Sequence, residues 1–99
     1  MILIVVKQPV RAKYAEDFPS LVGDFTTASR AEPGCIEHGV TIDANDGLRL
    51  VFFERWADLD ALLVHFRVPA SREFGAQAAR LATRPPDLAA YDATELKLR

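Results

Sequence analysis

The sequence predicts an α+β domain with a ferredoxin-like order of elements, β-α-β-β-α-α-β, and one four-stranded antiparallel sheet. Residues 48–66, LRLVFFERWADLDALLVHF, are typical of a strand that runs directly into a helix. In that strand large apolar side chains stand at both parities, so both faces of the sheet need cover. Helices cover only one face in this fold. A second copy of the chain is therefore expected on the other face, which predicts a homodimer.

The other elements are predicted from apolar periodicity and from turn residues. Pro19 favours a first helix that begins late, near Asp17, and Pro33-Gly34 ends that helix. Asp58 stands where a helix N-cap belongs. We expect strands at residues 2–10, 35–43, 48–56 and 88–98, a hairpin turn at 43–47, and helices at 14–31, 58–66 and 70–82.

Each predicted helix carries an apolar stripe that is expected to pack on the sheet. The stripe of the first helix is Phe18, Leu21, Val22, Phe25 and Ala28. The stripe of the second helix is Leu59, Leu62, Leu63 and Phe66. The stripe of the third helix is Phe74, Ala78 and Leu81.

Composition limits the classes of protein and of partner. The chain of 99 residues is expected to form one domain, and its 49% hydrophobic content supports a buried interface. The net charge is −2 and the basic residues are scattered, so neither a nucleic acid nor a membrane partner is expected. Cys35 is the single cysteine, which excludes an internal disulfide, and we expect a cytoplasmic location.

Three motifs give the chain a resemblance to a known family. They are RAEPGCI at residues 30–36, FERWAD at 53–58, and His65 followed by Pro69. Together they resemble the antibiotic biosynthesis monooxygenase domain, from the first strand to Tyr91. The resemblance implies a dimeric α+β barrel with a pocket between helices and sheet in each subunit. The family includes cofactor-free quinone-forming oxygenases, haem-degrading enzymes and an enzyme of autoinducer-2 breakdown.

Departures from the family pattern narrow these expectations. Haem-degrading members carry an Asn in the first strand and a His in the last helix region, and residues 2–6 and 70–81 hold neither. Some quinone-forming members place an Asn where Phe52 stands here. The histidines, the cysteine and the carboxylates show no spacing along the chain that is typical of a metal site. We therefore expect no haem, no metal and no other cofactor.

A cofactor-free oxygenase needs a base, hydrogen-bond donors and a dry pocket. His38 and His65 are the only histidines, so one of them is the expected base. Each also has a structural alternative, because His38 shares the parity of apolar neighbours and His65 lies at the edge of a helix stripe. The expected substrate-binding residues are Trp56, Tyr91, Phe25 and Phe66.

The leading hypothesis is a cofactor-independent monooxygenase that oxidises a small aromatic or phenolic substrate with dioxygen. A second hypothesis is a non-catalytic module that binds a small hydrophobic metabolite. A third is an isomerase or lyase that acts on a small carbonyl compound. A histidine within reach of a bound phenol would favour oxidation, whereas a wholly apolar pocket would favour binding alone.

Overall fold

The computed structural model describes residues 1–98 and has the predicted α+β architecture. Its order of elements agrees with the sequence prediction, with one additional 3₁₀ turn, η1, before the first long helix. The strands are β1 (Ile2–Pro9), β2 (Cys35–Asp43), β3 (Asp46–Trp56) and β4 (Asp87–Asp92). The helices are η1 (Ala12–Tyr14), α1 (Phe18–Arg30), α2 (Leu59–Arg67) and α3 (Pro69–Leu81).

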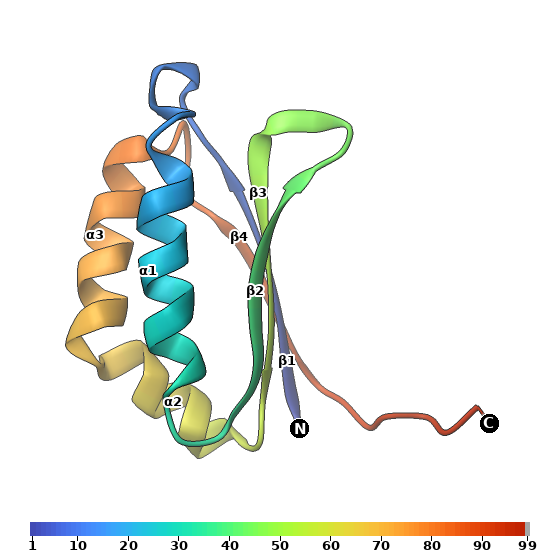
Figure 1. The fold of residues 1–99 in the computed structure, drawn as a ribbon. Helices are drawn as coiled ribbons and strands as arrows, with labels where there is room; N and C mark the ends of the chain where they lie inside the picture. The colour runs from blue at the N-terminus through green and yellow to red at the C-terminus, as the bar shows by residue number, and fades with distance from the viewer. Residues whose placement is uncertain (99) are drawn as a thin grey trace.

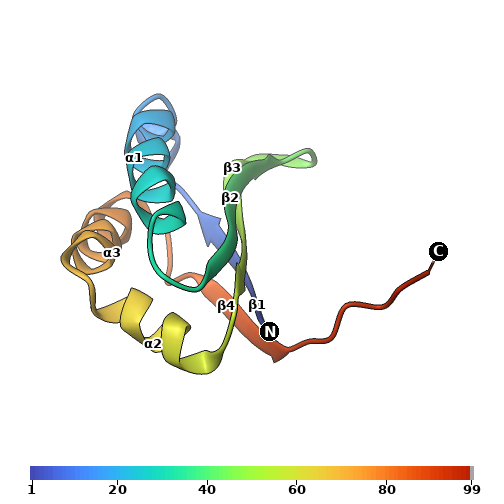
Figure 2. The ribbon, with the colours of Figure 1, turned by 60° about the horizontal axis from the view of Figure 1, so that its bottom comes forward.

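The four strands form one antiparallel sheet in the order β2-β3-β1-β4, which is the ferredoxin-like order. Figures 1 and 2 show α1, α2 and α3 gathered on one face of this sheet, while none of the described residues forms a helix on the opposite face. The helices and the sheet therefore form two layers, and a space between these layers can hold a site.

None of the helices in residues 1–98 combines the length and the apolar character that a membrane span requires.

The strand register places two polar side chains next to each other on the face that the helices cover. His38 of β2 stands opposite Glu54 of β3, and Glu54 stands opposite Ile4 of β1. A bulge at Ile36 precedes His38 and shifts the register of β2 between Cys35 and Glu37. Because residues directly opposite each other in an antiparallel sheet have adjacent side chains, His38 and Glu54 meet.

The core between the layers is divided into two clusters of apolar side chains. One joins Val10, Phe18, Phe25, Leu50 and Phe52. The other joins Ile4, Trp56 and Leu62 beneath α2. The prediction that alternate β3 side chains, from Leu50 to Trp56, face the same way is confirmed by their burial on the helix side.

The N-cap of α2 is confirmed, but the predicted apolar stripe of that helix is wrong. The Asp58 side chain accepts a hydrogen bond of 2.8 Å from the backbone N–H of Ala61. Only Leu62 and His65 are buried in this helix, whereas Leu59, Leu63 and Phe66 are exposed. The helix is rotated so that His65 faces the sheet, where polar partners meet it.

Two further predictions need correction. In α1 the buried positions are Phe18, Phe25, Thr26 and Ser29, while Ala28 is exposed. The last strand ends at Asp92, because Asp92 already pairs with Ile2, the first residue of β1. One more pair of backbone hydrogen bonds joins Met1 and Ala93, and the chain then leaves the sheet as an extended tail (Figure 1).

The sheet face away from the helices exposes apolar side chains. Phe53 of β3 stands opposite Val5 of β1, and Tyr91 of β4 stands opposite Leu3. Phe53 is 37% exposed and Tyr91 is 55% exposed. We call this surface the open sheet face, defined by Leu3, Val5, Val51, Phe53 and Tyr91.

Candidate functional site

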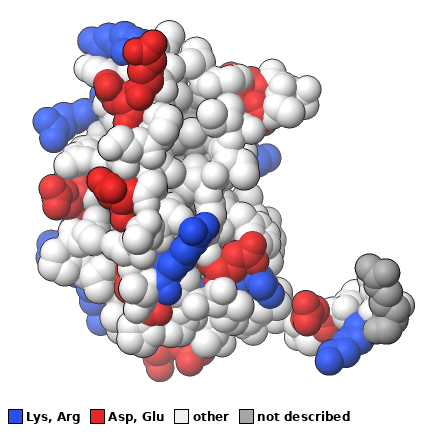
Figure 3. Space-filling view, viewed as in Figure 1, with Lys and Arg blue, Asp and Glu red and all other residues white. Residues whose placement is uncertain are grey.

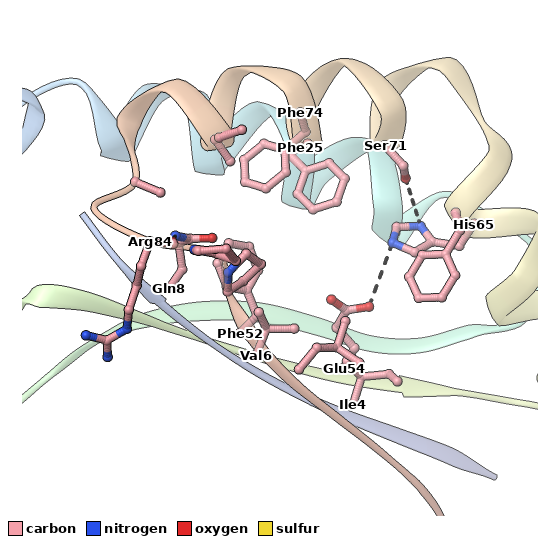
Figure 4. Close-up of a pocket in the computed structure, with 18 of the residues that line it drawn as sticks. Ile4, Val6, Gln8, Phe25, Phe52, Glu54, His65, Ser71, Phe74 and Arg84 are labelled. Atoms are coloured by element: carbon pink, nitrogen blue, oxygen red, sulfur yellow. Dashed lines mark hydrogen bonds and ion pairs between the residues drawn. The ribbon is translucent and has the colours of Figure 1, made fainter. Parts of the chain in front are cut away.

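A cavity of about 500 Å³ lies between α3, the end of α2 and the strands β1 and β3 (Figure 4). Its wall is mostly apolar, with Ile4, Val6, Phe25, Phe52, Phe66 and Phe74 among the lining residues. Polar side chains stand at two ends of it. His65, Glu54 and Ser71 are at one end, and Gln8 and Arg84 are at the other (Figure 4). An apolar cavity with a few convergent polar groups is typical of a small-molecule site.

His65 is held at the wall of this cavity by a carboxylate behind it. Its Nδ1 lies 3.0 Å from Oε1 and 3.1 Å from Oε2 of Glu32, which follows α1. The hydroxyl oxygen of Ser71 lies 3.3 Å from the same nitrogen. Since an ionised carboxylate can only accept, the proton of neutral His65 belongs on Nδ1. Its Nε2 then carries a lone pair, which faces Glu54 and the cavity.

Glu54 is a buried carboxylate between two histidines. Its Oε2 lies 3.3 Å from Nε2 of His38, and its Oε1 lies 3.8 Å from Nε2 of His65. Burial alone would raise the pKa of Glu54, but the approach of His38, the Trp56 indole and His65 outweighs it. The net pKa of Glu54 therefore lies below its ordinary value. Glu54 is consequently a carboxylate at neutral pH.

Trp56 contacts both Glu54 and His65. Its indole N–H donates a hydrogen bond of 2.9 Å to Oε1 of Glu54. Its ring packs on the His65 ring, with centroids 4.4 Å apart. Trp56 is fully buried and is not among the residues that line the cavity. It therefore orients Glu54 and His65, and the predicted substrate-binding role of Trp56 finds no surface of this residue in the cavity.

His38 is buried beside the cavity rather than in its wall. It is 1% exposed, and the Phe25 ring packs against it edge-on with centroids 5.1 Å apart. Although Nε2 of His38 approaches Glu54, neither ring nitrogen has an aligned hydrogen bond within residues 1–98. A base at His38 would thus have to act through Glu54.

The remaining predicted site residues separate into two groups. Phe25 and Phe66 line the cavity, as a substrate-binding role requires. Tyr91 points to the open sheet face and is not among the lining residues. Cys35 is half-buried, and burial first, then the charges of Glu54 and Glu32, raises its thiol pKa. That thiol is therefore a weak nucleophile.

Sequence reasoning did not assign Glu32, Ser71 and Gln8 to the site. Glu32 is part of the motif at residues 30–36, so the motif marked the segment without revealing its contact with His65. The Gln8 side chain donates to the backbone oxygens of Pro9 and Arg84, at 3.0 and 3.4 Å, which leaves its own oxygen free to accept. The sequence signal for Gln8 was its position in β1, where it shares the parity of Ile4 and therefore faces the helices.

The structure also assembles three potential metal ligands that spacing along the chain did not indicate. One ligand atom each from His38, Glu54 and His65 lies within 4.8 Å of the others. The three residues come from β2, β3 and α2. Because tertiary packing alone joins these elements, no local spacing could have indicated the group.

On the face shown in Figure 3, basic and acidic side chains are interspersed, and neither sign forms a large continuous patch. This agrees with the net charge of −2. The distribution gives no electrostatic reason to expect a polyanion on this face.

The elements and the cavity together define a small ferredoxin-like domain with a mostly apolar cavity between its two layers. The antibiotic biosynthesis monooxygenase family matches residues 1–77. An uncharacterized protein from Synechocystis sp. is 33% identical over 94 residues, which is 93% of this chain and 64% of that protein. This chain thus spans just under two thirds of that relative. The chain belongs to the antibiotic biosynthesis monooxygenase family.

Solved structures share the fold across nearly the whole chain. A protein from Mycobacterium tuberculosis is 26% identical, with a TM-score of 0.88 and 96% of each chain covered. A cofactor-independent oxygenase from Streptomyces nogalater is 16% identical, with a TM-score of 0.84, covering 99% of this chain and 97% of that one. At the latter identity the likeness concerns the fold alone.

Proposed function

We propose that the protein is a cofactor-independent monooxygenase that oxidises a small aromatic phenol or quinol with dioxygen in the cavity beside His65. The observation that carries the proposal is the carboxylate–imidazole pair at one end of an apolar cavity. Glu32 holds Nδ1, so Nε2 of His65 is oriented to take a proton. One structural relative, the oxygenase from Streptomyces nogalater, is cofactor-independent, which supports this reaction class.

His65 would act as the general base. A phenol loses its proton only near pH 10 in water, so oxidation at neutral pH needs an acceptor at hydrogen-bond distance. When His65 takes that proton, the imidazolium lies between the carboxylates of Glu32 and Glu54. Both carboxylates stabilise the positive charge, and the largely apolar wall limits competition from water.

The oxidation can be balanced with dioxygen as the only co-reactant. The phenolate transfers one electron to dioxygen, and the resulting phenoxyl radical and superoxide combine at a ring carbon to form a peroxide anion. The His65 imidazolium returns its proton to this anion, which gives a hydroperoxide. Loss of water from the hydroperoxide leaves a quinone. One oxygen atom therefore enters the product, and the other leaves as water after the substrate has supplied four electrons.

The far end of the cavity supports a substrate with a second polar group. Gln8 follows Ile4 by four residues on β1, and Ile4 stands opposite Glu54. At about 3.3 Å per residue, Gln8 lies about 13 Å along the strand from the level of Glu54. An aromatic body with hydroxyl groups near both ends would place one hydroxyl at His65 and let the other donate to the Gln8 oxygen.

The test is oxygen uptake by variants of the two histidines, after a thermal-shift screen of phenols and quinols has identified a substrate. His65→Ala should lower kcat by about 10²–10⁴-fold, the usual effect of losing a general base. His38→Ala should cause a smaller loss, because His38 does not line the cavity. Circular dichroism must show that both variants are folded.

Full activity in a folded His65→Ala variant would contradict the assignment of the base. If His38→Ala then lost the activity, the base would be His38. A ligand that stabilises the protein with no oxygen uptake would favour the binding-module alternative. Conversion of a small carbonyl compound without oxygen uptake would favour the isomerase or lyase alternative.

A further inference from the structure

His38 is a buried polar side chain that the proposed oxidation does not use. It is 1% exposed, and both of its ring nitrogens lack a hydrogen-bond partner within residues 1–98. Leaving a polar group buried and without a hydrogen-bond partner destabilises the folded state. Its Nε2 points at the Glu54 carboxylate from 3.3 Å, without the alignment of a hydrogen bond. A group that accepts the lone pair of Nε2 would satisfy that nitrogen.

Three donor atoms converge at this point. They come from His38, Glu54 and His65, each buried, and they lie within 4.8 Å of one another. Zinc binds imidazole nitrogen and carboxylate oxygen at about 2.0–2.2 Å, so neighbouring ligands in a tetrahedral shell stand about 3.3–3.6 Å apart. Nε2 of His38 lies 3.3 Å from Oε2 of Glu54, which already has this length, and Nε2 of His65 lies 3.8 Å from the other carboxylate oxygen, Oε1, which is close to it.

The surrounding contacts are those that orient metal ligands. Glu32 contacts Nδ1 of His65, and this contact directs the Nε2 lone pair of His65 toward Glu54. The Trp56 indole binds one oxygen of Glu54. Such partners fix the tautomer and the orientation of ligating side chains in metalloproteins. Two carboxylates, Glu54 and Glu32, also supply the negative charge that a divalent cation needs.

We propose that His38, Glu54 and His65 form a binding site for a divalent first-row transition metal ion, with its open coordination position toward the cavity. Two imidazoles and one carboxylate suit Zn²⁺, Co²⁺ or Fe²⁺ better than Mg²⁺ or Ca²⁺, which prefer oxygen ligands. The site goes beyond the proposed oxidation and opposes it. The Nε2 lone pair of His65 cannot bind a metal and accept a proton at the same time, so a bound ion blocks the base.

Binding is tested on the full chain after dialysis against a chelator. Titration with Zn²⁺ in a calorimeter should show one site per chain, and Co²⁺ should develop the visible absorption of a low-coordinate site. His38→Ala and Glu54→Gln should each weaken binding at least tenfold, since each removes one ligand. Glu37→Gln is the matched control, because Glu37 pairs with Arg55 on the opposite sheet face. Its affinity should equal that of the wild type.

No saturable Zn²⁺ binding by the wild type would overturn the proposal, and so would unchanged affinity in a folded His38→Ala variant. If His38→Ala fails to fold, His38→Gln replaces it, because glutamine keeps a polar group and removes the imidazole. Mg²⁺ is the ion control and should produce no comparable binding.

The inhibitory effect has its own readout. Stoichiometric Zn²⁺ should stop substrate oxidation by the wild type and by Glu37→Gln, and a chelator should restore it. Full activity with the site saturated would overturn the claim that the ion blocks His65. If no phenol is oxidised, the proposed function fails, while the calorimetric and Co²⁺ measurements still decide the metal site independently.

Discussion

Gly34 shows how one residue fixes the approach of α2 to the chain before β2. It has a φ of 82°, in the left-handed region that glycine tolerates best. A Cβ at this position would lie 2.5 Å from the Cβ of Ala61 in α2. The same approach aligns the backbone, because the N–H of Ala57 donates to the Gly34 oxygen at 2.8 Å.

We therefore predict that Gly34→Ala lowers the free energy of unfolding by about 1–3 kcal/mol, through backbone strain and overpacking. Gly23 is the matched control, since it lies in α1 and a Cβ there meets nothing within 4 Å. Gly23→Ala should raise the free energy of unfolding by about 0.5–1 kcal/mol. Urea denaturation measures both values, and equal shifts in the two variants would refute this account of Gly34.

At the scale of elements, the orientation of α2 decides which side chains reach the site. The rotation that buries Leu62 and His65 leaves Leu63 at 38% exposed. Leu62 packs with Ile4 and Trp56, and Trp56 in turn contacts Glu54 and His65. The position of His65 therefore depends on this packing as much as on its contact with Glu32.

We predict that Leu62→Ala destabilises the fold by about 2–5 kcal/mol, the usual effect of deleting a buried leucine side chain. Leu63→Ala, one residue further on, should change stability much less because Leu63 remains in contact with solvent. Thermal and urea unfolding of the two variants compare the faces directly. A larger loss in Leu63→Ala would show that the helix is rotated toward the stripe first predicted from the sequence.

The buried face of β3 could be predicted from the sequence, whereas the buried face of α2 could not. Alternation in β3 located Phe52, Glu54 and Trp56 on one face, because the period of a strand is fixed. In α2, four large apolar residues lie close enough to define a stripe, so hydrophobicity alone favoured the wrong face. The buried place of His65 depends on Glu32 and Glu54, which are distant in sequence. Its site partners could therefore be found only from tertiary structure.

For the molecule as a whole, the open sheet face is covered by none of the helices in residues 1–98 (Figure 2). The described part of the tail also exposes Leu96 and Leu98. Because large exposed apolar patches usually mark an interface, these surfaces support the homodimer predicted from the sequence. The dimer remains our proposal.

Sedimentation equilibrium at micromolar concentration should give a mass of about twice the 11.0 kDa of one chain. Phe53→Asp should dissociate the dimer, because an unpaired buried carboxylate is strongly unfavourable. Val64→Asp is the matched control, since Val64 is exposed on α2 away from the open sheet face. A monomeric wild type, or a Phe53→Asp variant that stays dimeric, would contradict the proposed interface.

We propose that the cavity beside His65 is where one atom of dioxygen enters an aromatic substrate without a cofactor. The most direct measurement is mass spectrometry of the product formed by chelator-treated protein under isotopically heavy dioxygen. Each quinone should carry one heavy oxygen atom, and the rate should fall with His65→Ala. Product that carries only oxygen from water, or turnover that requires an added metal or organic cofactor, would contradict it.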